Sequence, residues 1–443
     1  KLRKKRPVMK NQTFCILPWV HLATYTDGTG LLCCIAKPGG EKTNLNTQTV
    51  DEVRNSDYFK DARLALQEGK QFHACTACYK EEAAGLRSHR LHENRFWRDT
   101  LGQEHIDSLI EDTKEDGSID NDVYTVDFRL GNTCNLACVM CRPQDSSKWY
   151  KEAQILSGTL KTGAKYEWQS KEKVDRDSFE WYKNPKFLES FYEASGEMRQ
   201  MIFAGGEPLL IKEHKAIIKE LVKRGTAKNI KVNYHTNGTI YDTELLELWK
   251  HFKRVDLFLS FDGIDRINKY VRYPSLHDTV VGNLKKYNDN APPNMHFKVL
   301  YTVQALNIYY IPEFVKWLLD MDLPRIADYK SKDNIADIIH TGILHYPQYL
   351  SPKIFPPRVK RQITRKLENF ILDYGDRINL DSIKGLCALM NEEDHSHLLN
   401  QFNDYLENID KLRKLNRKEA FKELDDMGIF KDARREVDHG PQS

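Results

Sequence analysis

The chain has 443 residues, of which 40% are hydrophobic and 30% charged, and its formal net charge is +3. This composition is typical of globular proteins, and the small net charge gives no reason to expect nucleic acid or a membrane as a partner. No apolar stretch approaches the roughly 18 residues of a membrane span. The basic segment 1–10 is not followed by an apolar run, so we do not interpret it as a signal peptide. We expect a cytoplasmic protein of two or three domains.

The nine cysteines are clustered along the chain, and only Cys387 stands alone. In a cytoplasmic chain of this size, clustered cysteines favour metal or cluster ligation over disulfides. The two groups are Cys15, Cys33, Cys34, Cys75 and Cys78, and then Cys134, Cys138 and Cys141.

The first group lies in an N-terminal region that we place at residues 1–110. It begins with Cys15-Ile-Leu-Pro-Trp, continues through an Asp-Gly turn to Cys33-Cys34, and ends with Cys75-Thr-Ala-Cys78. Four soft ligands fit either a fully ligated [4Fe–4S] cluster or a four-cysteine zinc site, and spacing alone does not choose between them. Residues 56–98 read as helical, and the acidic stretch 111–121 reads as a linker.

Strand and helix signals alternate over residues 122–345, which predicts parallel strands in a full or partial barrel. In such barrels the chemistry lies at the carboxyl ends of the strands. Helices are expected between the strands, for example at 212–224 and 242–253. The expected strands are 123–130, 201–203, 230–235, 255–261, 297–303 and 338–344.

Two further segments remain without a firm role. An insertion at 142–200 is rich in aromatic residues, including Trp149, Tyr166, Trp168 and Trp181, and could be a lid over the barrel or an ordinary aromatic core. Residues 346–443 have the pattern of amphipathic helices, with segments at 359–374 and 397–412.

The second cysteine group follows the first barrel strand at once, as Cys134-Asn-Leu-Ala-Cys138-Val-Met-Cys141. Three thiolates with C-x3-C-x2-C spacing on a loop can bind three irons of a cubane cluster and leave the fourth iron open to a ligand. The alternative is a zinc site, which requires a fourth protein ligand that this loop lacks.

This triplet after a first strand resembles the radical SAM superfamily. The resemblance implies a partial (β/α)6 barrel and a [4Fe–4S] cluster whose open iron binds S-adenosylmethionine. Reductive cleavage of that cofactor then gives a 5′-deoxyadenosyl radical. The residue before the last cysteine is often aromatic in the family and packs on adenine. Here it is Met140, whose thioether can fill the same space.

The ends of the next strands carry further matches. Gly205-Gly206-Glu207 resembles the family's GGE motif, which holds the amino group of the cofactor's methionine. A tight turn is the alternative when the motif is taken alone. Asn237 and Asp262 follow the next two strands as weaker matches. We expect Asn237 to be one of the cofactor-binding residues, and an Asx turn is the alternative for both. A serine and an arginine with the spacing of Ser260 and Arg272 bind the cofactor's carboxylate in related enzymes.

The N-terminal cysteines resemble the twitch domain, a shortened relative of the SPASM domain that carries one auxiliary [4Fe–4S] cluster. The resemblance implies Cys15, Cys33, Cys75 and Cys78 as its ligands. The spacing from the Asp-Gly turn favours Cys33, and Cys34 is then a neighbour or a spare. Here the domain precedes the barrel, whereas it usually follows it.

Together these features predict an enzyme that abstracts a substrate hydrogen atom, with the auxiliary cluster carrying an electron. The resemblance implies a peptide or a sugar or aminocyclitol as substrate, with oxidation, epimerisation or crosslinking as the outcome. It also implies an electron donor such as flavodoxin or ferredoxin. The alternatives are a non-catalytic iron–sulfur electron-transfer protein and a zinc-binding scaffold.

Overall fold

The computed structural model describes residues 12–39, 43–83, 87–156, 177–326 and 339–430. The chain forms two compact units. The first comprises Lys1–Thr133, Asp175–Tyr234 and Glu247–Val255, and the second comprises Cys134–Val174, His235–Leu246 and Asp256–Ser443. None of the helices in the described ranges combines the length and the apolar character that crossing a bilayer requires.

The first unit is built on parallel strands in the order β2-β1-β3-β4-β5, with the two-residue β2 antiparallel to β1. The second unit has the order β6-β7-β8, in which β7 and β8 are parallel. The strands are β1 (His21–Thr24), β2 (Gly30–Leu31), β3 (Thr125–Arg129), β4 (Gln200–Ala204), β5 (Lys231–Thr236), β6 (Arg254–Ser260), β7 (Met295–Val303) and β8 (Ile339–Ile343).

The six strands expected for the barrel are confirmed as β3 to β8, with ends that differ by a few residues. Ile338, the first residue expected in the last of them, lies outside the described residues. The strands β1 and β2 were not expected. All four residues of β1 are buried, so this strand lacks the alternation by which a half-buried strand is identified. The result is an α/β fold with parallel strands, consistent with a partial barrel.

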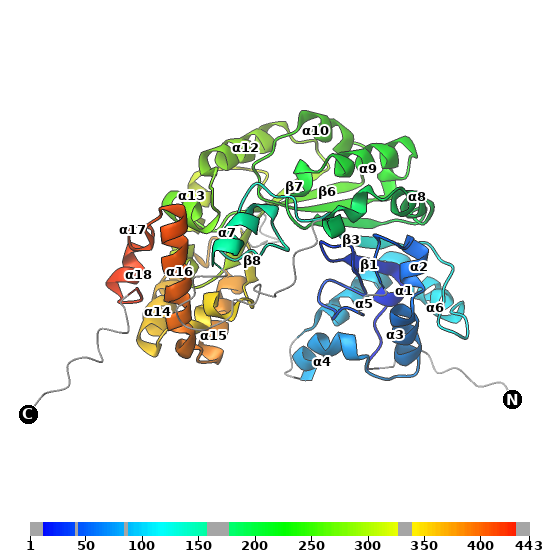
Figure 1. Ribbon diagram of the computed structural model, residues 1–443, viewed down its shortest axis with the longest axis horizontal. Coiled ribbons are helices and arrows are strands. Elements are labelled where there is room, and N and C mark those ends of the chain that lie inside the picture. The colour runs from blue at the N-terminus through cyan, green and yellow to red at the C-terminus, as the bar shows by residue number, and fades with distance from the viewer. Residues whose placement is uncertain (1–11, 40–42, 84–86, 157–176, 327–338, 431–443) are drawn as a thin grey trace, which may run out of the picture. The chain divides into compact units, whose positions relative to one another are not determined.

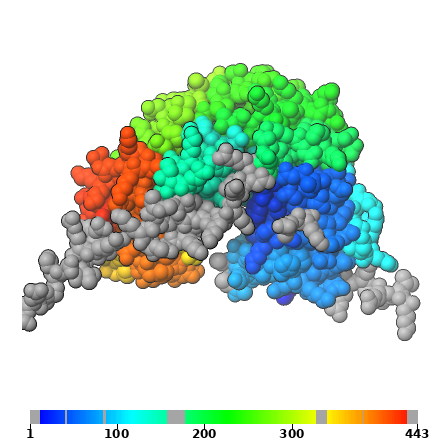
Figure 2. Space-filling view, viewed as in Figure 1, coloured from blue at the N-terminus to red at the C-terminus, as the bar shows by residue number. Residues whose placement is uncertain are grey.

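The helices of the first unit cover the strands and supply its core. They are α1 (Leu17–Val20), α2 (Val50–Arg54), α3 (Asp57–Gln67), α4 (Thr76–Ala83), α5 (His89–Leu101), α6 (Gln103–Glu111), α8 (Pro185–Glu193) and α9 (Lys212–Lys223). Figure 2 shows the surface of the N-terminal residues in blue. The helix α10 (Thr243–Trp249) contributes residues to both units.

Much of the aromatic insertion is core rather than lid. Phe128 of β3 packs edge-on against Trp181, Phe187 and Phe191, with ring centroids 5.3 to 5.6 Å apart. All four side chains are at most 1% exposed. Tyr166 and Trp168 lie outside the described residues. For the part that is described, the ordinary aromatic core is therefore the correct interpretation.

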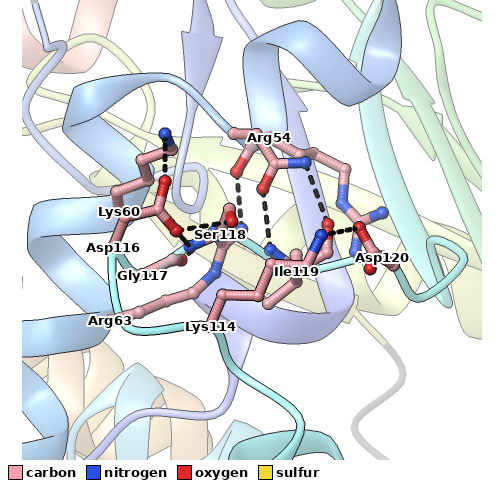
Figure 3. A network of polar contacts seen from close by, with 10 residues as sticks. Arg54, Lys60, Arg63, Lys114, Asp116, Gly117, Ser118, Ile119 and Asp120 are labelled. Atoms are coloured by element: carbon pink, nitrogen blue, oxygen red, sulfur yellow. Dashed lines mark hydrogen bonds and ion pairs between the residues drawn. The ribbon is translucent and has the colours of Figure 1, made fainter.

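Two buried arginines anchor the acidic stretch 111–121, which we expected to be a linker (Figure 3). Arg63 is fully buried, and its guanidinium donates to the carbonyl oxygens of Gly117 at 3.0 Å and Arg54 at 2.6 Å. Arg54 donates in turn to the carbonyl oxygen of Asn121 at 2.7 Å. Burial lowers the pKa of both guanidinium groups, that of Arg63 to about 9. The stretch is thus a fixed part of the first unit.

The second unit ends in helices, as the sequence predicts. The helix α14 (Pro357–Tyr374) packs against α13 (Ile311–Asp320) and α15 (Asp381–Glu392), as Figure 1 shows. Its buried residues Val359, Ile363, Leu367 and Phe370 form one apolar stripe. The helices of this unit are α7 (Tyr150–Leu156), α11 (Asp265–Val271), α12 (His277–Asn290), α13 (Ile311–Asp320), α14 (Pro357–Tyr374), α15 (Asp381–Glu392), α16 (Leu399–Arg413), α17 (Arg417–Ala420) and α18 (Lys422–Asp426).

Candidate functional site

The three cysteines of the C-x3-C-x2-C motif lie on a loop at the start of the second unit. Cys138 is buried, whereas Cys134 and Cys141 are partly exposed. The loop is bonded to the chain that leaves α11, because Ala137 N–H donates to the Tyr273 carbonyl at 2.5 Å and Val139 N–H donates to the Val271 carbonyl at 2.8 Å. This backbone pairing brings Arg272 to the loop.

Hydrogen-bond donors converge on the sulfur atoms of this loop. Asn237 Nδ2 lies 3.8 Å from Cys134 Sγ, and Arg272 Nη1 lies 3.9 Å from Cys138 Sγ. The Leu136 N–H also donates to Cys134 Sγ at 3.5 Å. A hydrogen bond from Cys141, and then the charge of Arg272, lower the pKa of Cys138 against the effect of burial. Donors aimed at thiolate sulfur are what iron–sulfur ligands require, so these residues fit a cluster.

Arg272 is held by a buried carboxylate that the sequence suggested only as a turn residue. Its Nε lies 2.7 Å from Asp262 Oδ2, and the Asp262 side chain is fully buried. The two atoms form a buried ion pair. Asp262 Oδ1 accepts from the Thr302 N–H at 2.8 Å. Burial raises the pKa of Asp262, but the adjacent guanidinium opposes this, and we assign the pair as charged. Asp262 therefore positions Arg272 beside Cys138.

The other residues of this unit that were predicted to bind the cofactor are Asn237, Met140 and Ser260. Asn237 forms the Asx turn given as its alternative role, since its Oδ1 accepts from the Thr239 N–H at 3.0 Å, and it also reaches Cys134. Met140 Sδ accepts from Gln304 Nε2 at 3.8 Å. Ser260 is the last residue of β6 and is partly exposed. The structure thus places Asn237 beside Cys134 and Arg272 beside Cys138.

Gly205, Gly206 and Glu207 belong to the first unit and fold against residues 131–133, which directly precede Cys134 in the sequence. A Cβ atom at Gly206 would lie 2.3 Å from the Thr133 carbonyl oxygen, and Gly205 has a φ of +113°. Both positions therefore need glycine. Glu207 is fully buried, and its Oε1 accepts from the Leu209 N–H at 3.1 Å. The tight turn given as the alternative is present. The motif packs against residues 131–133 of the same unit.

Four of the five N-terminal cysteines line one small cavity in the first unit. The lining consists of Cys15, Leu17, Cys33, Ile35, Ala36, Cys75, Ala77, Cys78, His89 and Arg90. Cys34 is not part of the lining, and its Sγ lies 4.0 Å from His89 Nε2. Burial raises the pKa of all four lining thiols, that of Cys75 to about 11. The convergence of four cysteines on an apolar cavity fits a fully ligated cluster.

No three His, Cys, Asp or Glu side chains in the described ranges lie close enough together to hold a single metal ion.

Two aromatic side chains at the cysteine loop were not anticipated from the sequence. Trp149 Nε1 donates to the Cys138 carbonyl at 3.0 Å, and the Tyr405 hydroxyl donates to the Val139 carbonyl at 2.6 Å. Trp149 was noted only as one of many aromatic residues in the insertion. Tyr405 is 266 residues from Val139, and no spacing or motif connects the two.

Comparison with known proteins gives one family and several solved structures. Residues 128–318 match the model of the radical SAM superfamily. No significant match is found among curated protein sequences. Native anSMEcpe with bound AdoMet is 18% identical, covers 61% of this chain and 67% of its own, and has a TM-score of 0.37. Streptococcus suis SuiB bound to precursor peptide SuiA is 15% identical, covers 76% of this chain and 67% of its own, and has a TM-score of 0.34.

The matched segment contains the elements that were expected to carry the chemistry. It begins within β3, includes the cysteine loop and the Gly205–Glu207 turn, and extends beyond Arg272 into α13. The similarity to the radical SAM superfamily therefore covers residues 128–318, which include the cysteine loop.

Proposed function

We propose that this chain is a radical SAM enzyme that cleaves S-adenosylmethionine reductively and abstracts a hydrogen atom from its substrate. The observation that carries the proposal is the loop with Cys134, Cys138 and Cys141, on whose sulfur atoms the N–H groups of Asn237 and Arg272 converge. The loop lies inside the segment that matches the radical SAM superfamily. A site-open [4Fe–4S] cluster bound there supplies the electron that cleaves the cofactor.

The residues around the loop have distinct roles in this proposal. Arg272 and Ser260 bind the carboxylate of the cofactor's methionine, and Glu207 accepts from its amino group. Asp262 keeps Arg272 oriented and charged. Met140 packs on the adenine, with its thioether held by Gln304. The binding energy of these groups orients the cofactor toward the open iron.

The four cysteines of the first unit hold an auxiliary [4Fe–4S] cluster in this proposal, within a twitch-like domain. All of them line one cavity, and Cys33 rather than Cys34 is in its wall, which supports Cys33 as the ligand. With four protein ligands, this cluster has no open iron and serves to carry an electron.

The substrate in this proposal is a peptide or a sugar or aminocyclitol, oxidised, epimerised or crosslinked after hydrogen abstraction. A reduced flavodoxin or ferredoxin supplies the electron. We favour this enzymatic role over an electron-transfer protein because such a protein has no need for an arginine aimed at a cluster cysteine or for the Gly205–Glu207 turn. A zinc scaffold is the second alternative.

The experiment is to purify the protein without oxygen and to measure iron, sulfide and zinc. We expect about eight irons per chain, as for two cubanes. Reduction with dithionite in the presence of S-adenosylmethionine should give 5′-deoxyadenosine, and a Cys138→Ala variant should give none. Zinc without iron would exclude the proposal, and 5′-deoxyadenosine formation by the variant would contradict the assignment of the site.

A further inference from the structure

The C-terminal helix α16 reaches the cysteine loop from a part of the chain outside the matched domain. Tyr405 of this helix is 1% exposed, and its hydroxyl donates to the Val139 carbonyl at 2.6 Å. Val139 stands between Cys138 and Met140. The bond is buried and connects residues 266 positions apart. The helix thus fixes a peptide group inside the motif itself.

A second residue of α16, two turns after Tyr405, secures the neighbours of the loop. The Arg413 side chain is fully buried and forms an ion pair with Glu152 at 2.7 Å. Its guanidinium lies 4.6 Å from the ring centroids of both Trp149 and Tyr273. Stacking on two aromatic faces suits the planar guanidinium of arginine.

These two rings belong to the segments that hold the loop. Trp149 donates from Nε1 to the Cys138 carbonyl at 3.0 Å. The Tyr273 carbonyl accepts from the Ala137 N–H at 2.5 Å. Arg413 therefore contacts both side chains, Trp149 and Tyr273, whose residues are hydrogen-bonded to the backbone near Cys138. Tyr405 is bonded to the carbonyl of the next residue, Val139.

We propose that α16 positions the cysteine loop for the open-site cluster, with Tyr405 and Arg413 as positioning residues. This inference rests on the function proposed above, since it assigns a role to the surroundings of the same cluster. Without the Tyr405 hydroxyl, the buried Val139 carbonyl loses its donor, and the loop must shift to find another. A shift at Val139 moves Met140 and changes the distances between the cysteine sulfur atoms and the N–H groups that point at them. The C-terminal region is thereby part of the cluster site.

The test compares Tyr405→Phe with Tyr270→Phe in the full-length protein with both clusters. The Tyr270 hydroxyl donates to Asp410 of the same helix at 2.8 Å, so Tyr270→Phe removes one hydrogen bond of α16 and leaves the bonds of Tyr405 and Arg413 in place. The readouts are the electron paramagnetic resonance signal that shifts when S-adenosylmethionine is added, and the rate at which a chelator removes iron. We expect Tyr405→Phe to alter the shifted signal and to lose that cluster about tenfold faster. Tyr270→Phe should match the unsubstituted protein.

Arg413→Lys serves as the second variant, because lysine keeps the charge facing Glu152 but not the planar stack. It should show the same change in the spectrum, so the test stands if Tyr405→Phe folds poorly. Equal spectra and equal rates of iron loss for Tyr405→Phe, Arg413→Lys and Tyr270→Phe would overturn the inference. An unsubstituted protein with no signal that responds to S-adenosylmethionine would instead contradict the proposed function.

Discussion

The two groups of cysteines differ in how the charged residues beside them are used. At the N-terminal cavity, Arg90 is turned to the scaffold, since its guanidinium pairs with Glu82 and donates to the Phe14 carbonyl. At the loop of the second unit, Arg272 points Nη1 at Cys138 Sγ. Its Nε forms an ion pair with Asp262 Oδ2 at 2.7 Å. Arg90 thus lines its cavity with its guanidinium bound to the scaffold, whereas Arg272 directs one nitrogen toward a cysteine of the loop.

This difference corresponds to the two roles that iron–sulfur clusters have. A cluster with four protein ligands needs only a closed, mainly apolar cavity, as the residues around Cys15 and Cys75 provide. A cluster that binds a cofactor needs polar groups placed in advance, as Asn237 and Arg272 are. The comparison therefore predicts that substitutions in the two places have separable effects on iron content and on cofactor binding.

The largest effect should come from replacing, one at a time, the adjacent cysteines Cys33 and Cys34 of the first unit. Cys33→Ala should lower the iron content from about eight to about four atoms per chain, because it removes one ligand of the auxiliary cluster. Cys34→Ala should leave the iron content unchanged, because Cys34 is not among the residues that line the cavity. Iron and sulfide assays on protein purified without oxygen measure both.

Loss of four irons in Cys34→Ala, with Cys33→Ala unaffected, would reverse the assignment. Equal and complete loss in both variants would indicate that this segment unfolds, and it would remove the basis for separating the two cysteines. Circular dichroism of both variants provides the control for folding.

A smaller effect, on cofactor binding, should follow from Arg272→Gln. The variant loses a charge-assisted hydrogen bond, worth about 1.5 to 3 kcal/mol, which corresponds to roughly a 10- to 100-fold weaker affinity for S-adenosylmethionine. The iron content of the auxiliary site should not change. Equilibrium binding of the cofactor to the reduced protein measures the affinity.

Arg142 provides a matched control for the loss of positive charge. It follows Cys141 directly but pairs with Asp145 at 2.9 Å. Arg142→Gln should therefore bind the cofactor as the unsubstituted protein does. If both variants weaken binding equally, the effect is one of net charge at the loop, and the specific role of Arg272 is wrong.

The sequence predicted the features whose signal is local and missed those that depend on distant pairing. The strands β3 to β8 and the cysteine motif follow from short patterns of apolar residues and spacing. The short strand β1 is buried along its whole length and shows no alternation. The contact of Tyr405 with Val139 forms only when a helix 266 residues away docks on the loop. The carboxylate of Asp262 had a local explanation, an Asx turn, that concealed its pairing with Arg272.

The smallest effect should come from Asn237→Ala, which removes the amide that faces Cys134 Sγ at 3.8 Å and donates to Asn135 Oδ1 at 2.8 Å. Hydrogen bonds to cluster sulfur atoms raise the reduction potential, so the open-site cluster of this variant should become harder to reduce, by no more than about 60 mV. The measurement is a redox titration followed by electron paramagnetic resonance. Thr239→Ala is the control, because it removes a hydroxyl that donates to Asn237 Oδ1 at 2.7 Å and accepts from Asn135 Nδ2 at 2.9 Å, while the Asn237 amide still faces Cys134. A potential that changes equally in both variants would show that the Asx turn, rather than the bond to sulfur, is what Asn237 contributes to the cluster.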